Sequence, residues 1–339
     1  MEPNPMQKFT YHAAASFSGK GKRFDPNSNV FQFNPFHRVQ PQIKRPKSKR
    51  PASGQDAFFI ARKGDTNDVA FGVADGVGGW EESGVDPADF SHSFCDYMAL
   101  AAYESKPDRP LTAKALMQKG YDDVCHDKSI PAGGSTACVA IVSEDGVMDV
   151  ANLGDSGFVH LRLNGVHHSS EAQTHAFNTP TNCPSSRRLC DYPKDADVTA
   201  HELRHGDVLV FASDGLWDNL FDQDVLRIAS RIMTGSGAWK ATDGGIRVVD
   251  DLGPYVEAHE SDADSAQKVA ATLQSAIAID VTATAKRASM DQRLDGPFAK
   301  EVQKYYPGED WHGGKIDDIC VIVVVVSEDG KSQAIKAKL

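Results

Sequence analysis

The sequence has no long apolar run, no dense cysteine spacing and no excess of basic residues, and each absence argues against a class of protein. Its most hydrophobic stretch, ICVIVVVV at 319–326, is far shorter than the ~20 residues that a transmembrane helix needs. The six cysteines include no CxxC pair, which argues against a zinc site or a disulfide framework. The net charge of −11 argues against a nucleic-acid binder. We therefore expect a soluble protein with free thiols.

What the sequence has instead is a series of apolar strands separated by helices. AFFIAR and VAFGVAD read as two strands joined by a polar turn, and STACVAIVS and VMDVANLG as two more. Helices are expected from Asp86, from Thr112 and over about 264–286, where capping residues or helical spacing occur. The unbroken apolar run at 319–326 indicates a strand buried on both faces. This order predicts an α+β sandwich of mainly antiparallel sheets flanked by helices.

The chain divides into two parts on composition. Residues 1–53 lack apolar periodicity and end in the basic, proline-bearing QIKRPKSKRPAS, so we expect a mostly irregular extension before one globular domain at 54–339. Phe31, Phe33 and Phe36 indicate that part of the extension packs as an edge segment. The basic run at 44–50 is typical of a solvated linker; contact with an anionic membrane surface or a phosphoprotein is the alternative. Inside the domain, we expect a flap-like stretch near 168–200 and a surface insertion near 234–264.

Acidic residues stand at the ends of several expected strands. VAFGVAD ends in Asp75, VLVFASD in Asp214 and VMDVANLGD in Asp155, while DDICVIVVVV begins with Asp317 and Asp318. If these strands are neighbours, their carboxylates converge, and two charges ~4 Å apart repel by roughly 4 kcal/mol at an effective dielectric near 20. Protons or cations must offset that repulsion. No histidine or cysteine joins the set at ligand spacing, and all-oxygen ligation favours Mg²⁺ or Mn²⁺.

A single Asp-Gly pair after a strand is weak evidence for such a site, because it is most often a turn. Asp145 and Asp329, each followed by glycine, are interpreted as turn residues. Glycine after Asp75 and Asp214 would instead let the backbone approach a metal closely. The joint arrangement, and the residues around each pair, therefore carry the prediction.

The motifs resemble those of a known family. GVADGVGGW, GGSTACVAIV, ANLGDSGFVHLR, LVFASDGLWDNL and DDICVIVVV are similar, in this order, to those of the type 2C metal-dependent serine/threonine protein phosphatases. The similarity runs from about Gln55 to the final strand. GVADGVGGW and THAFNTP, at 174–180, are most like the mitochondrial Ptc-seven-type branch. The resemblance implies an α-β-β-α sandwich and a location in the mitochondrial matrix. It also implies hydrolysis of phosphoserine and phosphothreonine by a hydroxide bridging two Mn²⁺ or Mg²⁺ ions.

The resemblance also implies a set of metal ligands, which are Asp56, Asp75, Gly76, Asp155, Asp214 and Asp317. Asp75 would bridge both ions, with the carbonyl oxygen of Gly76 on one of them. Asp214 and Asp317 would hold the second ion and, with Asp75, carry catalysis. Asp56 would reach an ion through water, and Asp155 would serve an additional, weaker metal site.

The sequence departs from the family pattern at three places. Gln55 stands where many relatives have glutamate, and Val77 stands where many have a histidine proposed as general acid. Leaving-group protonation would then come from a metal-bound water or another group. The phosphate-binding arginine would fall on Pro51, so Arg50 is the nearest candidate and Arg62 the next.

Two alternatives to a protein phosphatase remain at this point. Gln55 and Val77 would suit a catalytically weak, pseudophosphatase-like scaffold that binds phosphoproteins, although binding alone would not need Asp75, Asp214 and Asp317 together. A phosphatase for small phosphorylated metabolites is the enzymatic alternative, because a metal centre recognises only the phosphoryl group. The expected partners are phosphorylated proteins and not nucleic acids.

Overall fold

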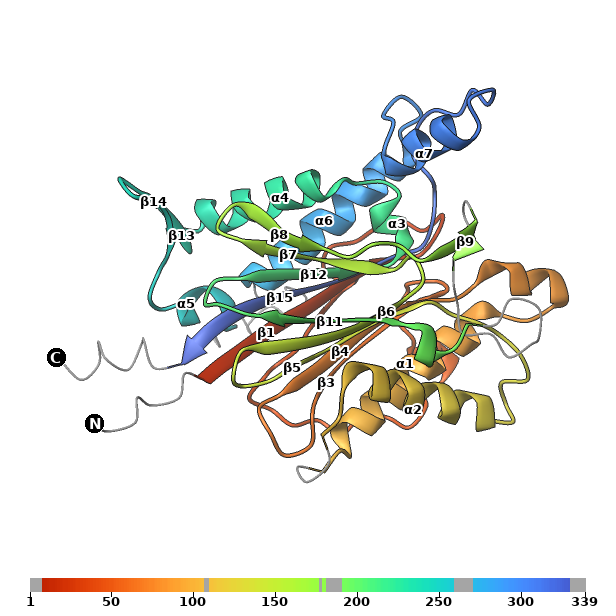
Figure 1. Cartoon of the computed structure of the whole chain (residues 1–339), viewed down its shortest axis with the longest axis horizontal. Helices are drawn as coiled ribbons and strands as arrows, with labels where there is room; N and C mark the ends of the chain where they lie inside the picture. The colour runs from red at the N-terminus through yellow and green to blue at the C-terminus, as the bar shows by residue number, and fades with distance from the viewer. Residues whose placement is uncertain (1–7, 107–109, 177–178, 181–190, 259–270, 330–339) are drawn as a thin grey trace.

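The computed structural model describes residues 8–106, 110–176, 179–180, 191–258 and 271–329. Two antiparallel sheets lie face to face between two layers of helices, so the predicted α+β sandwich with α-β-β-α layers is confirmed (Figure 1). A buried cluster of aromatic and aliphatic side chains fills the space between the sheets. Within the described residues, no helix is both long and apolar enough to cross a membrane.

The first sheet has six strands and contains both the first and the last strand of the described chain. Its order is β2 (Val30–Gln32), β1 (Lys8–Ser18), β15 (Ile319–Asp329), β12 (Val208–Ala212), β7 (Gly157–Arg162) and β8 (Gly165–Ser169). The five-stranded second sheet runs β11 (Asp197–Glu202), β6 (Val147–Leu153), β5 (Ala137–Val142), β4 (Val69–Asp75) and β3 (Asp56–Arg62). Two hairpins lie apart, formed by β9 (Thr174–Ala176) with β10 (Thr179–Pro180) and by β13 (Trp239–Thr242) with β14 (Gly245–Val248).

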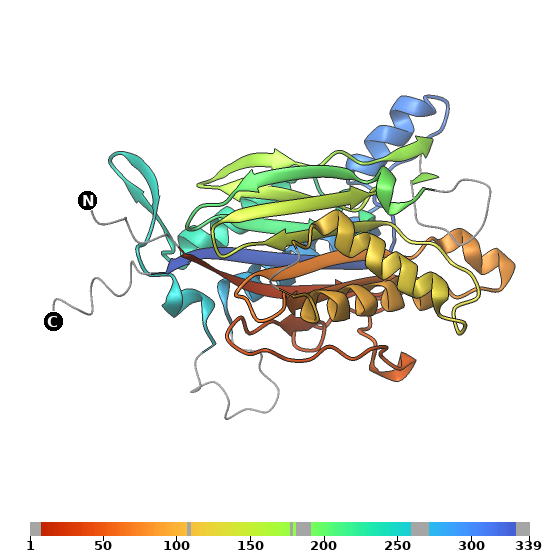
Figure 2. The same ribbon diagram turned by 60° about the horizontal axis from the view of Figure 1, so that its bottom comes forward.

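Helices cover the outer face of each sheet (Figure 2). The second sheet is covered by α1 (Pro87–Tyr103) and α2 (Ala113–His126), and the first by α4 (Asp222–Gly235) and α6 (Leu273–Met290). The shorter helices are α3 (Asp214–Trp217), α5 (Gly253–Val256) and α7 (Pro297–Tyr305), with 3-10 turns at Lys47–Lys49, Gly78–Ser83 and Pro193–Asp195. The side chains of Asp86 and Thr112 accept hydrogen bonds from the first turns of α1 and α2, which confirms both predicted helix starts.

The last strand is buried on both faces, as its composition predicts. Val321 and Val323 of β15 pack in the cluster under α4 and α6, whereas Ile322 and Val324 pack between the sheets. Successive side chains of a strand point to opposite faces, so a strand covered on both sides needs apolar residues at every position.

The predicted boundary at residue 53 is wrong, because β1 belongs to the domain. It pairs antiparallel with β15 over its whole length, from Lys8 opposite Asp329 to Ser18 opposite Ile319. Ala13 and Ala15 of β1 are fully buried. A strand covered on both faces shows no alternation of apolar and polar residues, and the small alanines of β1 give too weak a hydrophobic signal to indicate a strand. The expected edge segment is present, since β2 pairs with β1 at the edge of the sheet.

The basic run is not simply a solvated linker either, because Lys44, Arg45, Lys47 and Arg50 each pair with an acidic residue of the domain. Arg45 Nε lies 2.6 Å from Asp96 Oδ1 on α1, and Lys44 Nζ lies 2.7 Å from Asp127 Oδ2. These pairs fasten the segment over the helical layer of the second sheet. They also occupy charges that a membrane surface would have to attract.

The two irregular stretches are shorter than expected. Strand β8 extends to Ser169 and β11 begins at Asp197, so the flap-like stretch is confined to 170–196, part of which lies outside the described residues. The expected insertion near 234–264 contains the β13–β14 hairpin, and Trp239 at its start is buried and donates its indole N–H to the carbonyl oxygen of Gly206 at 3.1 Å. Helix α6 begins only at Leu273, after its cap Thr272.

Candidate metal centre

The strand-end aspartates meet at the end of the sandwich that lies opposite the two chain ends (Figure 1). Asp56 and Asp75 are direct cross-strand partners, the first residue of β3 and the last of β4. Asp214 begins α3 directly after β12, and Asp317 lies just before β15. Asp155 lies in the turn between β6 and β7. The structure therefore brings together every aspartate that the sequence predicted as a ligand.

Three of these carboxylates, those of Asp56, Asp75 and Asp155, are buried, and their burial opposes ionisation. Burial, followed by the charges of Asp56 and Asp214, raises the pKa of Asp75 well above its usual range. Burial, followed by the charge of Asp318, does the same to the pKa of Asp56. The pKa of Asp155 is raised to about 7, again by burial first and then by Asp214. Such a group needs cations if all its members are to be ionised at neutral pH.

Two buried oxygens of the cluster have no hydrogen-bond donor. Asp56 accepts from Ser213 Oγ at 2.5 Å through Oδ2, but its Oδ1 is buried without a partner. Asp155 Oδ1 is likewise buried and unpartnered. An unsatisfied buried acceptor costs ~1–3 kcal/mol, and more when it is charged. A divalent cation would satisfy these oxygens, and an all-oxygen set fits Mg²⁺ or Mn²⁺.

The carboxylates are not, however, gathered around an ion-sized point. Among the described residues, no group of three acidic, imidazole or thiol side chains is already placed to hold one ion. Instead, Asp214 and Asp218 both face the ammonium of Lys315, whose Nζ lies 2.6 Å from an Oδ2 atom of each. The aspartates therefore fit the ions by chemistry and position, and small side-chain movements would complete the coordination.

Sequence reasoning missed Asp218 and Lys315. Asp218 follows Asp214 by one helical turn in SDGLWDNL, and that spacing could have identified it. The pKa of Asp218 is raised by burial and by Asp214, despite the neighbouring Lys315. Lys315 carried no signal in the sequence, because only the folded chain places it against α3.

Two glycines are required by close packing at the site. A Cβ atom on Gly215 would lie 1.8 Å from the carbonyl oxygen of Asp318, and one on Gly76 would lie 2.8 Å from the carbonyl oxygen of Pro87. Neither position has room for a side chain. At both Asp-Gly pairs the glycine lets its segment pack directly against the backbone of another segment, as expected of a metal site. The ligand role of the Gly76 carbonyl stays a prediction.

The two arginines behave differently from each other. Arg62 ends β3 at the opposite end from Asp56 and is bound to Thr66 O and Asn67 Oδ1, so its prediction as a phosphate ligand is wrong. Six residues of extended strand separate it from Asp56 by about 20 Å. Arg50 is paired with Asp89 at 2.8 Å on the first turn of α1. Its phosphate role stays a prediction.

Gln55 supports the site through its backbone. Its N–H donates to Asp318 Oδ2 at 2.8 Å, while its side-chain amide donates to Glu81 Oε1 at 2.6 Å. Val77 has only its backbone engaged, donating to the carbonyl oxygen of Gly134 at 3.0 Å. Despite both departures, the aspartates of the cluster are all present.

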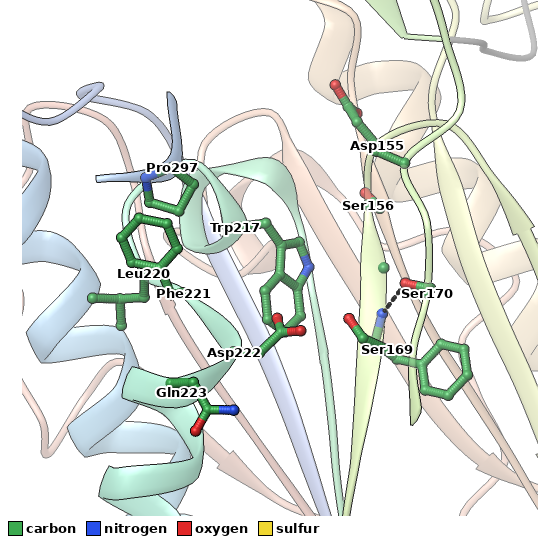
Figure 3. Close-up of a pocket in the computed structure, with 13 residues that line it drawn as sticks. Asp155, Ser156, Ser169, Ser170, Trp217, Leu220, Phe221, Asp222, Gln223 and Pro297 are labelled. Atoms are coloured by element: carbon green, nitrogen blue, oxygen red, sulfur yellow. Dashed lines mark hydrogen bonds between the residues drawn. The ribbon is translucent and has the colours of Figure 1, made fainter. Parts of the chain in front are cut away.

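A pocket of about 400 Å³ opens beside Asp155, between β7–β8 and the segment that joins α3 to α4 (Figure 3). One wall is apolar and comprises Trp217, Leu220, Phe221 and Pro297. The opposite wall is polar and includes Ser156, Ser169 and Ser170. Trp217 is fixed there, because its indole N–H donates to the carbonyl oxygen of Ala212 at 2.9 Å. The pocket is large enough for one bulky side chain.

Comparison with known proteins agrees with this site. The family model described as protein phosphatase 2C matches residues 47–243. The protein phosphatase PTC7 homolog of Xenopus laevis is 32% identical over 284 residues, which cover 81% of this chain and 82% of the relative. The mitochondrial protein phosphatase 2C homolog 7 of Saccharomyces cerevisiae is 29% identical over 336 residues, or 94% of this chain and 83% of the relative.

Solved structures show the same architecture. The photosystem II phosphatase PBCP is 26% identical and superposes with a TM-score of 0.60, covering 80% of this chain and 91% of its own. The catalytic domain of the serine/threonine phosphatase PstP, solved with two manganese ions, has 14% identity and a TM-score of 0.50 over 94% of this chain and 99% of its own, and it supports the fold. The resemblance read from the motifs is confirmed: the chain belongs to the protein phosphatase 2C family of serine/threonine phosphatases.

Proposed function

We propose that this phosphatase uses two Mn²⁺ or Mg²⁺ ions, held by the strand-end aspartates, to hydrolyse phosphoserine and phosphothreonine on other proteins. The observation that supports this best is the convergence of Asp56, Asp75, Asp214 and Asp317 at one end of the sandwich, with a buried oxygen of Asp56 left without a donor. When bound, the ions would supply a bridging hydroxide for in-line attack on phosphorus and would neutralise the phosphoryl oxygens.

The chain's own carboxylates would hold the two ions and offset their charge. Asp75 would lie between the two ions, with Asp214 and Asp317 on the second and Asp56 acting through water. Asp155 would serve an additional, weaker site. The direct pairing of Asp56 with Asp75 fixes their separation through the β3–β4 ladder, and Ser213 orients the Asp56 carboxylate. Preorganised ligands of this kind lower the cost of assembling the site at each turnover.

Arg50 would contribute to phosphate binding only by leaving its partner. Its guanidinium is bound to Asp89, and the side chain is 10% exposed. A bidentate guanidinium would suit a phosphoryl group. Replacing Arg50 with methionine should then raise KM for p-nitrophenyl phosphate, and an unchanged KM would assign the phosphate contact elsewhere.

The pocket beside Asp155 would receive a side chain of the substrate protein. Its apolar wall, with Trp217 and the 45% exposed Phe221, suits a bulky apolar residue adjacent to the phosphorylated one. The names of the relatives support a mitochondrial setting, since the yeast protein is named as mitochondrial. We therefore propose mitochondrial phosphoproteins, in the matrix, as the substrates.

The decisive test is hydrolysis of p-nitrophenyl phosphate and of a phosphothreonine peptide with Mn²⁺, with Mg²⁺ or with chelator. The native protein should require a metal, and Asp214→Asn should reduce its rate at least about a hundredfold, because one carboxylate of the metal site is lost. A folded protein that is inactive with every metal would instead support the scaffold alternative. Faster turnover of sugar phosphates than of the peptide would support a metabolite phosphatase.

A further inference from the structure

Lys315 lies at the centre of the aspartate cluster. Its Nζ is 2.6 Å from Asp214 Oδ2, 2.6 Å from Asp218 Oδ2 and 3.4 Å from Asp317 Oδ2. Its side chain is 17% exposed. One cation thus contacts three carboxylates, two of which are proposed ligands of the same metal ion.

The side chain of Asn219 holds the backbone of Lys315 in place. Asn219, which follows α3, accepts from the Lys315 N–H at 3.0 Å and donates to the Lys315 carbonyl oxygen at 2.9 Å. The same amide donates to the carbonyl oxygen of Gly215 at 2.9 Å. The ammonium also lies 5.2 Å from the ring centre of Phe298 on α7. Lys315 is therefore fixed against α3 and is not a mobile surface lysine.

A divalent ion and this ammonium would compete for the same oxygens. A metal needs carboxylate oxygens at 2.0–2.2 Å, and an ammonium within hydrogen-bond distance of those groups repels it. In the described part of the chain, the other ammonium within 4 Å of these aspartates is Lys20, 3.4 Å from Asp317 Oδ1 and 61% exposed.

We infer that Lys315 is a built-in counter-ion that stabilises the metal-free site and sets how much divalent cation the enzyme needs. This inference rests on the proposed metal centre and adds a residue that regulates its occupancy. Without metal, Lys315 offsets the repulsion among Asp214, Asp218 and Asp317. When metal binds, Asp214 and Asp317 would be shared between the ion and the ammonium, so part of the binding free energy is lost to the repulsion between these two cations.

The test measures metal binding directly on chelator-treated protein. Mn²⁺ binding, followed by the electron paramagnetic resonance signal of the free ion, is compared for the native chain, Lys315→Met and Lys315→Arg. Lys315→Met should bind Mn²⁺ at least about tenfold more tightly, because a close like charge is removed. It should also unfold at a lower temperature in chelator and gain more from added Mn²⁺. Lys315→Arg keeps the charge and should stay near native in both measurements.

Lys20→Met is the matched control, because it removes an exposed ammonium beside the same aspartate and solvent screens that charge. It should change the Mn²⁺ affinity less than about twofold. Unchanged or weaker Mn²⁺ binding in Lys315→Met would overturn the inference. If the same variant resisted inhibition by inorganic phosphate, Lys315 would be a phosphate ligand. Failure of the proposed function is a separate result: native protein that binds Mn²⁺ without hydrolysing phosphomonoesters.

Discussion

The hydroxyl of Ser213, at the end of β12, donates to Asp56 Oδ2 across the gap between the two sheets, at 2.5 Å. Ser213 Oγ in turn accepts from the N–H of Cys320 on β15 at 3.1 Å. One small side chain therefore fixes the orientation of a carboxylate on the second sheet relative to two strands of the first.

Removing that hydroxyl should weaken metal binding. In Ser213→Ala, Asp56 loses its side-chain donor, which costs ~1–3 kcal/mol for a charged acceptor and favours its protonated form. The Mn²⁺ concentration for half-maximal activity should rise several-fold. Ser91→Ala is the control, because buried Ser91 donates to the carbonyl oxygen of Gln55 and to no carboxylate. Equal metal requirements for the two variants would contradict this role.

His12 should make the fold sensitive to acid. It is buried on β1 with its Nε2 3.0 Å from Ser327 Oγ, and burial lowers its pKa to about 4. The unfolded chain, with an ordinary histidine pKa of about 6.5, therefore binds a proton more readily, and stability is lost as pH falls from about 6.5 toward 4. His12 by itself should account for ~2 kcal/mol of the loss at pH 5 relative to pH 8, and buried His92, whose pKa burial also lowers to about 4, should add to the total.

Urea unfolding at pH 8 and pH 5 measures this loss. His12→Gln, which cannot titrate, should lose ~2 kcal/mol less than the native protein over the same interval. His126→Gln, a change at an exposed histidine on α2, should behave as native. A native pH dependence in His12→Gln would assign the acid sensitivity to other groups.

A charge on β1 should unfold the domain. Ala14 is fully buried between β15 and β2, so Ala14→Glu places a carboxylate with no partner inside the sheet. We expect a loss of at least ~3 kcal/mol or an insoluble product. Arg23→Glu, in an exposed position of the following loop, should leave stability within about 0.5 kcal/mol of native. Equal stability of the two variants, measured by urea unfolding, would restore the view of 1–53 as an extension.

A change in the pocket beside Asp155 should slow the hydrolysis of phosphopeptides and not that of small substrates. Phe221→Ser removes an aromatic ring from its apolar wall, so kcat/KM should fall about three- to tenfold for a phosphopeptide with a bulky apolar residue beside the phosphothreonine. The rate with p-nitrophenyl phosphate should stay near native. Tyr305→Ser, at an exposed aromatic of α7, is the control. An equal loss with both substrates would indicate damage to the metal centre.

The sequence predicted which aspartates the fold brings together, because strand ends are readable from composition. Asp75 and Asp214 each close an apolar run, and a sheet brings such ends together. Arg62 lies far from the aspartate cluster although it is only six residues from Asp56 in the sequence, because β3 is extended and carries its two ends far apart. Lys315 could not be predicted, because its three carboxylates come from α3 and from the start of β15 only after folding.

The N-terminal strand was missed for a different reason. A strand that is covered on both faces loses the alternation that identifies strands, and alanines such as Ala13 and Ala15 supply little hydrophobic signal. The starts of α1 and α2 were easier to predict, since the capping residues Asp86 and Thr112 are local signals that do not depend on the rest of the chain.

The pairing of β1 with β15 also dictates when the molecule can fold. His12 Nε2 lies 3.0 Å from Ser327 Oγ across these two strands, although the residues are 315 positions apart in the chain. A ribosome therefore releases the first strand long before its central partner exists, and loop closure of that length is slow. Until β15 is made, the unpaired edge of the alanine-rich β1 can pair with other chains and aggregate, and chaperones can bind it. The strand-end aspartates, which come from both sheets, should consequently assemble only after synthesis has passed the last strand.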